Sequence, residues 1–219
     1  MENISARTNR RLVEPAVAPS RIAPVPSSWR NGLPVLTGSM ATLRELRLAD
    51  AAALLAMLST EEVTRFISPA PATLEGFERF IAWSNRERAQ GTAMCFAVVP
   101  HGMDAPVGIF QIRQIEPDFA TAEWGFAIAS AFWGTGLFLD AARLVADFAF
   151  DVIQIHRLEA RAAVLNGRGL GALRKIGAVP EGILRKSLLR NGEYLDQALW
   201  TILDDDWRAM RVNTGIKVH

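Results

Sequence analysis

Residues 131–150 read AFWGTGLFLDAARLVADFAF, and this stretch constrains the fold more than any other part of the chain. It directly follows TAEWGFAIAS, residues 121–130, which has the apolar character of a strand. From residue 137 onward, apolar side chains recur at helical spacing, at Leu137, Ala141, Leu144, Val145 and Phe148. Gly134 and Gly136 are therefore predicted to lie in a turn between a strand and the N-terminus of an amphipathic helix.

A glycine turn that leads from a strand into a helix is a suitable site for an anion. The first helical N–H groups lack partners within the helix, and the helix dipole places about half a positive charge there. Two nucleotide-binding loops are excluded, because a Walker A loop needs Lys and then Ser or Thr at Leu137 and Phe138, and a Rossmann loop needs a third glycine at Leu139. Two interpretations remain open, a phosphate-binding turn and a tight turn that binds nothing.

The rest of the chain divides into short helices and strands. Helical periodicity predicts helices that begin near Asp50, at 73–90 before Gly91, at 166–176 before Gly177, and from 204 onward. Runs of apolar residues between turn residues predict strands at 36–46, 93–100, 105–115, 156–165 and on both sides of the RNGEY turn at 190–194. Strands and helices in this mixture predict an α+β (α/β) fold.

The first 35 residues differ in character from the rest of the chain. They are rich in Pro, Ser, Ala and Arg and have no sustained periodicity, so we expect residues 1–35 to form a flexible or extended arm. One folded domain is expected over residues 36–210, with residues 211–219 as a C-terminal tail.

Composition excludes several other classes of protein. With 24 Lys plus Arg against 23 Asp plus Glu, the net charge of +1 gives no field that would attract nucleic acid, and no such partner is expected. The single Cys95 cannot close an internal disulfide, and three scattered histidines do not make a zinc site, so no metal is expected. Because no apolar run is long enough to cross a bilayer, we expect a soluble, cytoplasmic protein without a membrane partner.

Several segments, in this order, resemble the GNAT superfamily of acyl-CoA-dependent N-acetyltransferases, in its RimJ/RimL-like branch. They are Leu43-Arg44-Glu45-Leu46 with Asp50-Ala51, then AEWGFAIASAFWGTG with Trp133-Gly134-Thr135-Gly136 in place of W-G-x-G, then HRLEARAAVLN, Lys175-Ile176-Gly177 and NGEYLDQALWTIL. The resemblance spans residues 36–207. It implies a central mixed, mostly antiparallel seven-stranded sheet, splayed between strands 4 and 5 and flanked by about four helices.

The resemblance also implies a site for acetyl-CoA. Backbone amides near the glycine pair would bind the pyrophosphate of coenzyme A, and the end of strand 4 would pair with the pantetheine arm. Asn166 would hydrogen-bond the pantetheine, although an N-cap role suits this residue equally well. The cofactor-binding residues implied are Phe126, Ala127, Ile128, Ala129, Ser130, Trp133, Gly134, Thr135, Gly136, Leu137, Phe138 and Asn166.

The chain departs from the family pattern at three positions. Ala131 stands where the family often has Gln or Arg, so one polar contact to the phosphates is missing; either the affinity is lower or a neighbouring Arg compensates. Gly169 and Leu173 stand where relatives carry Ser or Tyr, which leaves no obvious acid for the departing thiolate. A thiol with a pKa near 8.5 leaves reasonably well without one.

Acetyl transfer needs a group that takes the proton of the amine and donors that stabilise an oxyanion. Glu123 is the candidate general base, acting through a water, with an ordinary solvent-facing strand residue as the alternative. Backbone N–H groups near residues 126–128 would polarise the carbonyl. Tyr194 and Asp196 either line the amine side or secure the last hairpin.

The function predicted is direct transfer of an acetyl group from acetyl-CoA to a primary amine in a ternary complex, by a monomer or homodimer. An N-terminal amine, with a pKa near 8, is neutral far more often at pH 7 than a lysine, so a protein or peptide N-terminus is the preferred acceptor. A cationic acceptor would need acidic residues, for which only Asp118, Glu123 and Asp196 are available. The alternatives are an enzyme for a small amine or antibiotic, a non-catalytic acyl-CoA-binding module, and an interaction protein that binds through its arm.

Overall fold

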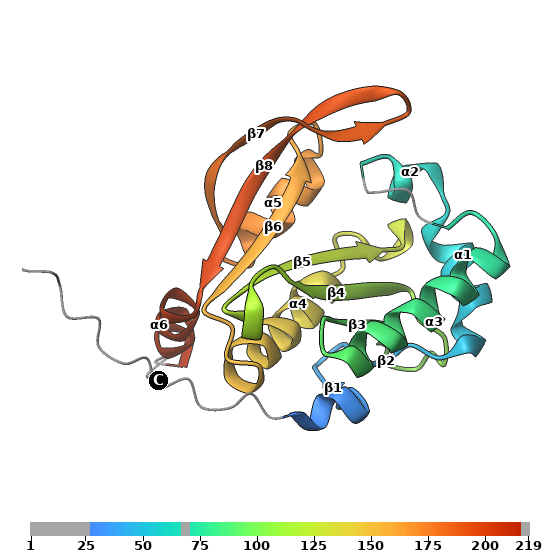
Figure 1. The fold of residues 1–219 in the computed structure, drawn as a ribbon, viewed down its shortest axis with the longest axis horizontal. Helices are drawn as coiled ribbons and strands as arrows, with labels where there is room; N and C mark the ends of the chain where they lie inside the picture. Colours follow the sequence, from blue (N-terminus) through green and yellow to red (C-terminus); the bar gives the residue numbers. More distant parts are fainter. Residues whose placement is uncertain (1–26, 67–70, 216–219) are drawn as a thin grey trace, which may run out of the picture.

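The computed structural model describes residues 27–66 and 71–215, and its strands form one mixed sheet of eight strands (Figure 1). Each neighbouring pair is antiparallel except β5 and β6, which run parallel. The order across the sheet is β1-β2-β3-β4-β5-β6-β8-β7. The strands are β1 (Leu36–Thr37), β2 (Ala41–Glu45), β3 (Ala93–Pro100), β4 (Gly108–Gln114), β5 (Thr121–Ile128), β6 (Arg157–Ala163), β7 (Val179–Arg190) and β8 (Glu193–Leu203).

The predicted α+β fold is confirmed, with eight strands where seven were expected. The difference arises in the first predicted strand, residues 36–46, which is broken by a turn. Leu36 and Thr37 fold back antiparallel on Leu43 and Thr42, so that one expected strand becomes two. The strand called 4 in the family pattern is accordingly β5, and strand 5 is β6.

Helices cover both faces of the sheet (Figure 1). One face packs on α1 and α3, and the other on α4, which continues into a π-helical turn. Neighbouring residues of β3 point to opposite faces, as strand geometry requires, so Cys95 belongs to the core under α1 and α3 and Phe96 to the core under α4. The helices are α1 (Ala51–Leu58), α2 (Glu61–Thr64), α3 (Leu74–Gln90), α4 (Leu137–Asp147), the π turn (Phe148–Val152), α5 (Gly167–Lys175) and α6 (Asp204–Gly215).

An ion pair explains the first motif of the family pattern. Arg44 on β2 forms two hydrogen bonds of 2.8 Å with the carboxylate of Asp50, the residue before α1. Burial alone would raise the pKa of Asp50, but hydrogen bonds from the Arg44 guanidinium and the Arg47 N–H outweigh it and lower that pKa. The pair therefore fixes the start of α1 to β2.

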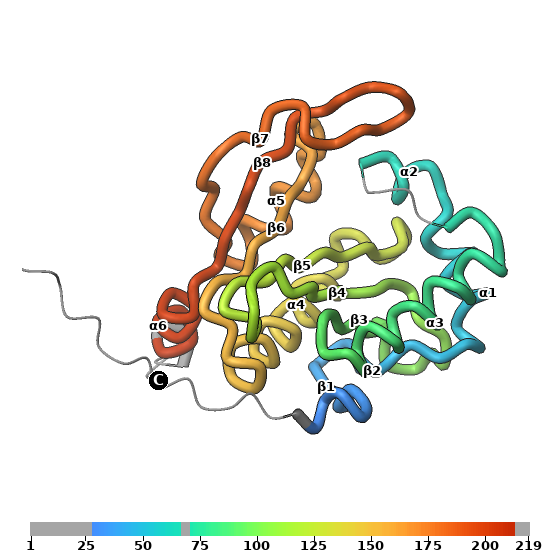
Figure 2. The backbone as a smooth tube through the Cα atoms, viewed as in Figure 1, coloured from blue at the N-terminus to red at the C-terminus, as the bar shows by residue number. Residues whose placement is uncertain are grey.

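The sheet divides between β5 and β6. The two strands pair only through Thr121 with Arg157, Ala122 with Leu158, and Glu123 with Glu159. Beyond these residues the strands separate, which Figure 2 shows as two tubes that diverge toward the β7–β8 hairpin. The predicted splay is confirmed, and it leaves a gap between β5 and β6 that a ligand can enter.

Regular structure extends beyond the predicted domain at both ends of the described chain. Trp29, within the predicted arm, is only 2% exposed and meets the ring of Phe119 edge-on, so the end of that arm joins the core. The helix α6 extends into the predicted tail as far as Gly215. Residues 1–26 and 216–219 lie outside the described residues. Within the described part, no helix combines the length and the apolar character needed to cross a membrane.

Candidate functional site

A cleft with a volume of about 700 Å³ lies where β5 and β6 separate. The end of β5 and the glycine loop form one wall, and α5 forms another. Residues of α2 and the segment after it, including Arg65 and Phe66, complete the rim. The cleft is therefore built from segments that are distant in the sequence.

The glycine loop exposes the N-terminus of α4 to this cleft. Gly134 and Gly136 have φ angles of +78° and +97°, a region that side chains disfavour. A Cβ atom on Gly134 would meet nothing within 4 Å, so this side of the backbone is open to a ligand. The first backbone hydrogen bond of α4 runs from Asp140 N–H to Gly136 C=O, 3.1 Å, and Leu137 N–H donates to the Thr135 hydroxyl, so the N–H groups of Phe138 and Leu139 remain available to an anion.

Asp140 lies in the first turn of α4 but is turned away from any anion in the cleft. Its carboxylate accepts hydrogen bonds from the N–H groups of Ser39, Met40 and Ala41 and from the Ser39 hydroxyl, at 2.6–3.2 Å. Burial raises the pKa of Asp140, but these hydrogen bonds outweigh it and the pKa lies below its ordinary value. The carboxylate thus holds the glycine-loop end of α4 against the turn between β1 and β2.

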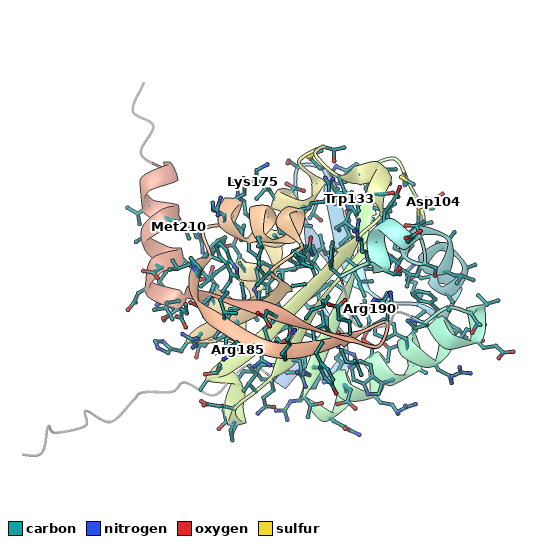
Figure 3. The ribbon with its side chains drawn as sticks, turned by 90° about the horizontal axis from the view of Figure 1, so that it is seen from above. Asp104, Trp133, Lys175, Arg185, Arg190 and Met210 are labelled. Atoms are coloured by element: carbon teal, nitrogen blue, oxygen red, sulfur yellow. The ribbon has the colours of Figure 1, made fainter. Side chains whose placement is uncertain are left out.

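Three cationic side chains line the cleft, and sequence reasoning named none of them as site residues. Arg168 on α5 lies over the Trp133 ring, with its guanidinium carbon 4.3 Å from the ring centroid, and the Trp133 indole N–H donates to Ile128 C=O at 2.8 Å. Lys175 and Arg65 also line the cleft. Figure 3 shows Lys175 and Trp133 along the same side of the molecule. Arg168 is a neighbouring arginine of the kind that would compensate for Ala131.

The backbone of β5 directs hydrogen-bond donors toward the opening. Ala129 N–H donates to Val107 C=O at 2.8 Å, and in an antiparallel pair alternate residues direct their N–H groups to the same partner. The N–H groups of Phe126 and Ile128 consequently point away from β4, to the side where β6 has separated. These two donors face the cleft rather than a neighbouring strand.

Asn166 is the N-cap of α5, which is one of the two roles proposed for it. Its side-chain oxygen accepts the Gly169 N–H at 2.9 Å. A Cβ atom on Gly169 would lie 2.6 Å from the Asn166 side-chain nitrogen, so a serine there would clash with this cap. The position of the Asn166 side chain therefore explains why glycine, and not the serine of many relatives, stands at position 169. Asn166 also lines the cleft, so the cap does not remove it from the site.

The structure brings most of the proposed cofactor residues together. Those that line the cleft are Phe126, Ala127, Ile128, Trp133, Gly134, Gly136, Phe138 and Asn166. The other four, Ala129, Ser130, Thr135 and Leu137, are not among the lining residues. Thr135 instead supports the loop, since its hydroxyl donates to Phe132 C=O at 2.8 Å and accepts the Leu137 N–H at 3.3 Å.

Glu123 lies at the last paired position of β5, beside the point where the strands separate, and does not line the cleft. Its side chain is 23% exposed and lies between two arginines. One carboxylate oxygen is 2.5 Å from Arg113 Nη2 on β4, and the other is 3.8 Å from Arg161 Nε on β6. The sequence did not indicate these arginines, because their proximity depends on the register of three strands.

Tyr194 and Asp196 lie in the β7–β8 hairpin, outside the lining of the cleft. Asp196 accepts the backbone N–H of Lys186 at 2.8 Å, at the point where the β7–β8 register shifts. The carbonyl of Tyr194 accepts a bond of 3.2 Å from the Lys186 ammonium, and the Tyr194 side chain is 55% exposed. These contacts agree with the hairpin-securing role.

Comparison with known proteins places this geometry among acetyltransferases. Residues 41–179 match the family model described as acetyltransferase (GNAT) domain. The probable N-acetyltransferase YjcK of Bacillus subtilis is 28% identical over 78% of this chain and 98% of its own length. The [ribosomal protein uS5]-alanine N-acetyltransferase of Escherichia coli is 23% identical over 62% of this chain and 71% of its own length. The structure of Mycobacterium smegmatis RimJ in complex with CoA-disulfide superposes with a TM-score of 0.72 at 20% identity, covering 83% of this chain and 95% of that one.

Proposed function

The chain belongs to the acetyltransferase (GNAT) family, and on that premise we propose that it transfers an acetyl group from acetyl-CoA to the N-terminal amine of a protein or peptide. The observation that carries this proposal is the cleft between β5 and β6, which combines an open helix N-terminus, unpaired strand donors and three cationic side chains. The alanine N-acetyltransferase activity of the uS5-modifying relative agrees with a protein N-terminus as the acceptor.

The residues of the cleft suit coenzyme A. The N–H groups before Asp140 and the cations Arg168 and Lys175 would hold the phosphate groups, since both attract anions. The open side of Gly134 gives a phosphate close access to the backbone. Asn166, through its side-chain NH₂, would donate to the pantetheine arm while its oxygen remains the cap of α5. When bound, acetyl-CoA supplies a thioester carbon that an amine can attack.

On this proposal, the chain contributes positioning, charge stabilisation and proton transfer. The N–H groups of Phe126 and Ile128 stabilise negative charge on the carbonyl oxygen, as preorganised donors do in acyl transfer. Glu123 accepts the proton of the acceptor ammonium through a water, because it lies beside the point where the two strands separate. We assign no acid to the leaving thiol, whose own pKa makes it a reasonable leaving group.

Direct transfer in a ternary complex fits the one thiol of the chain. Cys95 is buried in the core under α1 and α3, and burial raises the pKa of its thiol to about 12. A buried, protonated thiol is a poor nucleophile, so Cys95 does not serve as an acyl carrier. The expected cytoplasmic location stays a prediction. The same holds for the expected monomer or homodimer.

The proposal is tested by acetyl-CoA turnover with a panel of amines, read as free thiol together with the mass of the acetylated product. Short peptides with free N-termini are expected to react, and matched peptides with blocked N-termini and one lysine are expected to react far more slowly. Initial rates with both substrates varied should give intersecting double-reciprocal lines. Tight binding of coenzyme A without thiol release for any amine would instead support a non-catalytic acyl-CoA-binding module.

A further inference from the structure

The point where β5 and β6 separate carries a group of arginines that the transfer reaction itself does not require. On the face of the sheet that bears Glu123, the next residue along β5 is Gly125 and the next along β6 beyond Glu159 is Arg161. Gly125 is exposed, and a Cβ atom built on it would meet nothing within 4 Å. A substrate that approaches Glu123 along this open side therefore meets the Arg161 side chain.

The N–H donors of the Arg161 guanidinium make no hydrogen bond within the described chain. Its side chain is 40% exposed, and its nearest carboxylate oxygens, on Glu123 and Glu159, are 3.8 and 3.9 Å away. Both distances exceed that of a hydrogen bond, and the Arg161 guanidinium donates no hydrogen bond to any of the described residues. An arginine has five N–H donors arranged to bind a carboxylate, so this side chain is available to one.

The nearby carboxylates already have closer partners. Glu159 accepts from Arg157 Nε at 2.8 Å, and Glu181 accepts from Arg157 and from the Thr201 hydroxyl at 2.5–2.8 Å. The hydrogen bonds from Arg157 and Thr201 hold the pKa of Glu181 at about 2. Glu123 itself is in contact with Arg113, whose side chain is 60% exposed. If the amine substrate carried a positive charge besides its reacting ammonium, that charge would thus find no unpaired carboxylate among these groups.

The β7–β8 hairpin carries a further arginine, Arg190, on the same face as Arg161. Residues that pair across antiparallel strands share a face, so Arg161 opposite Leu199, and Arg190 opposite Glu193, lie on one face of the hairpin and β6. The Arg190 Nε is buried without a hydrogen-bond partner in the described chain. Figure 3 shows Arg190 near the end of the hairpin. Arg161 and Arg190 therefore lie on one face, and neither guanidinium donates a hydrogen bond to a carboxylate of the described residues.

We infer that the acceptor is an N-terminal amine followed by an acidic side chain at its second or third residue, and that Arg161 binds this carboxylate. The inference rests on the proposed function and narrows its substrate class. Arg161 Nε lies 3.8 Å from a Glu123 oxygen, and each residue advances a peptide by at most about 3.6 Å. The side chains one and two residues after an amine near Glu123 are therefore within reach of Arg161. Arg190 would meet acidic residues further along the peptide.

The test compares three tetrapeptide amides that begin with Ser and carry Glu, Gln or Lys at the second position. With the wild-type protein and acetyl-CoA, kcat/KM is expected to be about tenfold higher for Glu than for Gln, and lowest for Lys. The ratio should fall toward one at about 1 M salt, where charges are screened beyond about 3 Å. Arg161→Gln should lower the Glu/Gln ratio to about one, and Arg161→Lys should restore part of it.

Arg143→Gln is the matched control, since Arg143 is an exposed residue of α4, the helix on the opposite face of the sheet, and this variant should keep the wild-type ratio. Equal or faster acetylation of the Gln or Lys peptide by the wild-type protein would overturn the inference while leaving the proposed function intact. Absence of thiol release with every peptide and with spermidine would overturn the proposed function and the inference together.

Discussion

The guanidinium of Arg168 lies over the indole of Trp133, 4.3 Å from the ring centroid, although one residue belongs to α5 and the other to the loop before α4. The indole N–H is fixed by Ile128 C=O, so the ring is a rigid support for the arginine. A contact between a cation and an aromatic ring contributes about 0.5–1 kcal/mol at an exposed site. The pair positions a positive charge beside the glycine loop, where the family's usual polar residue is replaced by Ala131.

Arg168→Gln is expected to raise the Kd for coenzyme A by about tenfold to a hundredfold, because it removes a charged donor to a phosphate group. Titration calorimetry measures this, and Arg174→Gln is the matched control, as Arg174 is on the same helix but does not line the cleft. Pantetheine, which lacks phosphates, should bind both variants equally well. An equal loss of affinity for pantetheine would mean that Arg168 acts by positioning Trp133.

Glu123→Gln is expected to lower kcat by about 10² to 10⁴, the usual contribution of a general base, with little change in the Kd for coenzyme A. Glu159→Gln is the control, because Glu159 is paired with Glu123 across the two strands but already accepts a hydrogen bond from Arg157. Pre-steady-state thiol release separates this effect from slow product release. Equal losses in the two variants would assign Glu123 a structural role within the ion-pair network.

Asn166 allows its two roles to be separated. Asn166→Asp keeps an acceptor for the Gly169 N–H and should leave the free energy of unfolding nearly unchanged, because Asp and Asn are equivalent N-caps. It removes the side-chain NH₂ donor and should weaken pantetheine binding. Asn166→Ala should lose both the binding and about 1 kcal/mol of stability. If Asn166→Asp binds pantetheine as well as the wild type does, the residue is a cap alone.

Asp140→Asn is expected to cost about 2 kcal/mol of unfolding free energy at pH 7, because it removes the charge that three N–H groups and a hydroxyl contact. The pKa of Asp140 is lowered in the folded state, so this stabilisation is present above the unfolded pKa, near 3.9, and is lost as the pH falls through the folded value. Urea unfolding at pH 7 and at successively lower pH should therefore show a difference in unfolding free energy between variant and wild type that shrinks as the pH falls below the unfolded pKa. A difference independent of pH would contradict this account.

Patterns within one segment predicted most of the fold. The glycine turn, the amphipathic α4 and the strand before it are local features, and they were located from periodicity and turn residues alone. Gly91 and Gly177 follow α3 and α5 as expected, both with positive φ angles. The turn between β1 and β2 was missed although Gly38 and Ser39 are turn residues, because β1 has only two residues, too few to show the alternation of a strand.

Contacts between distant segments were not predictable in the same way. Asp140 binds Ser39, 101 residues away, and neither residue is unusual in its own segment. Arg113 and Arg161 meet Glu123 only because β4, β5 and β6 pair in one register. Arg168 was indicated only as an unnamed neighbouring arginine, since the sequence does not fix which face of α5 meets Trp133.

The three residue pairs between β5 and β6 are the only strand pairing that joins the two halves of the sheet in the described chain. The adjoining ladders on either side of this junction, β4–β5 and β6–β8, are antiparallel and run over seven pairs each. Such a short seam is expected to open in amide hydrogen exchange before either half unfolds. A ligand that contacts both β5 and α5 binds only the form in which the three pairs are intact. By mass action it would slow amide exchange on both sides of the seam. Coenzyme bound where the strands separate would thus hold together the three pairs that still join them.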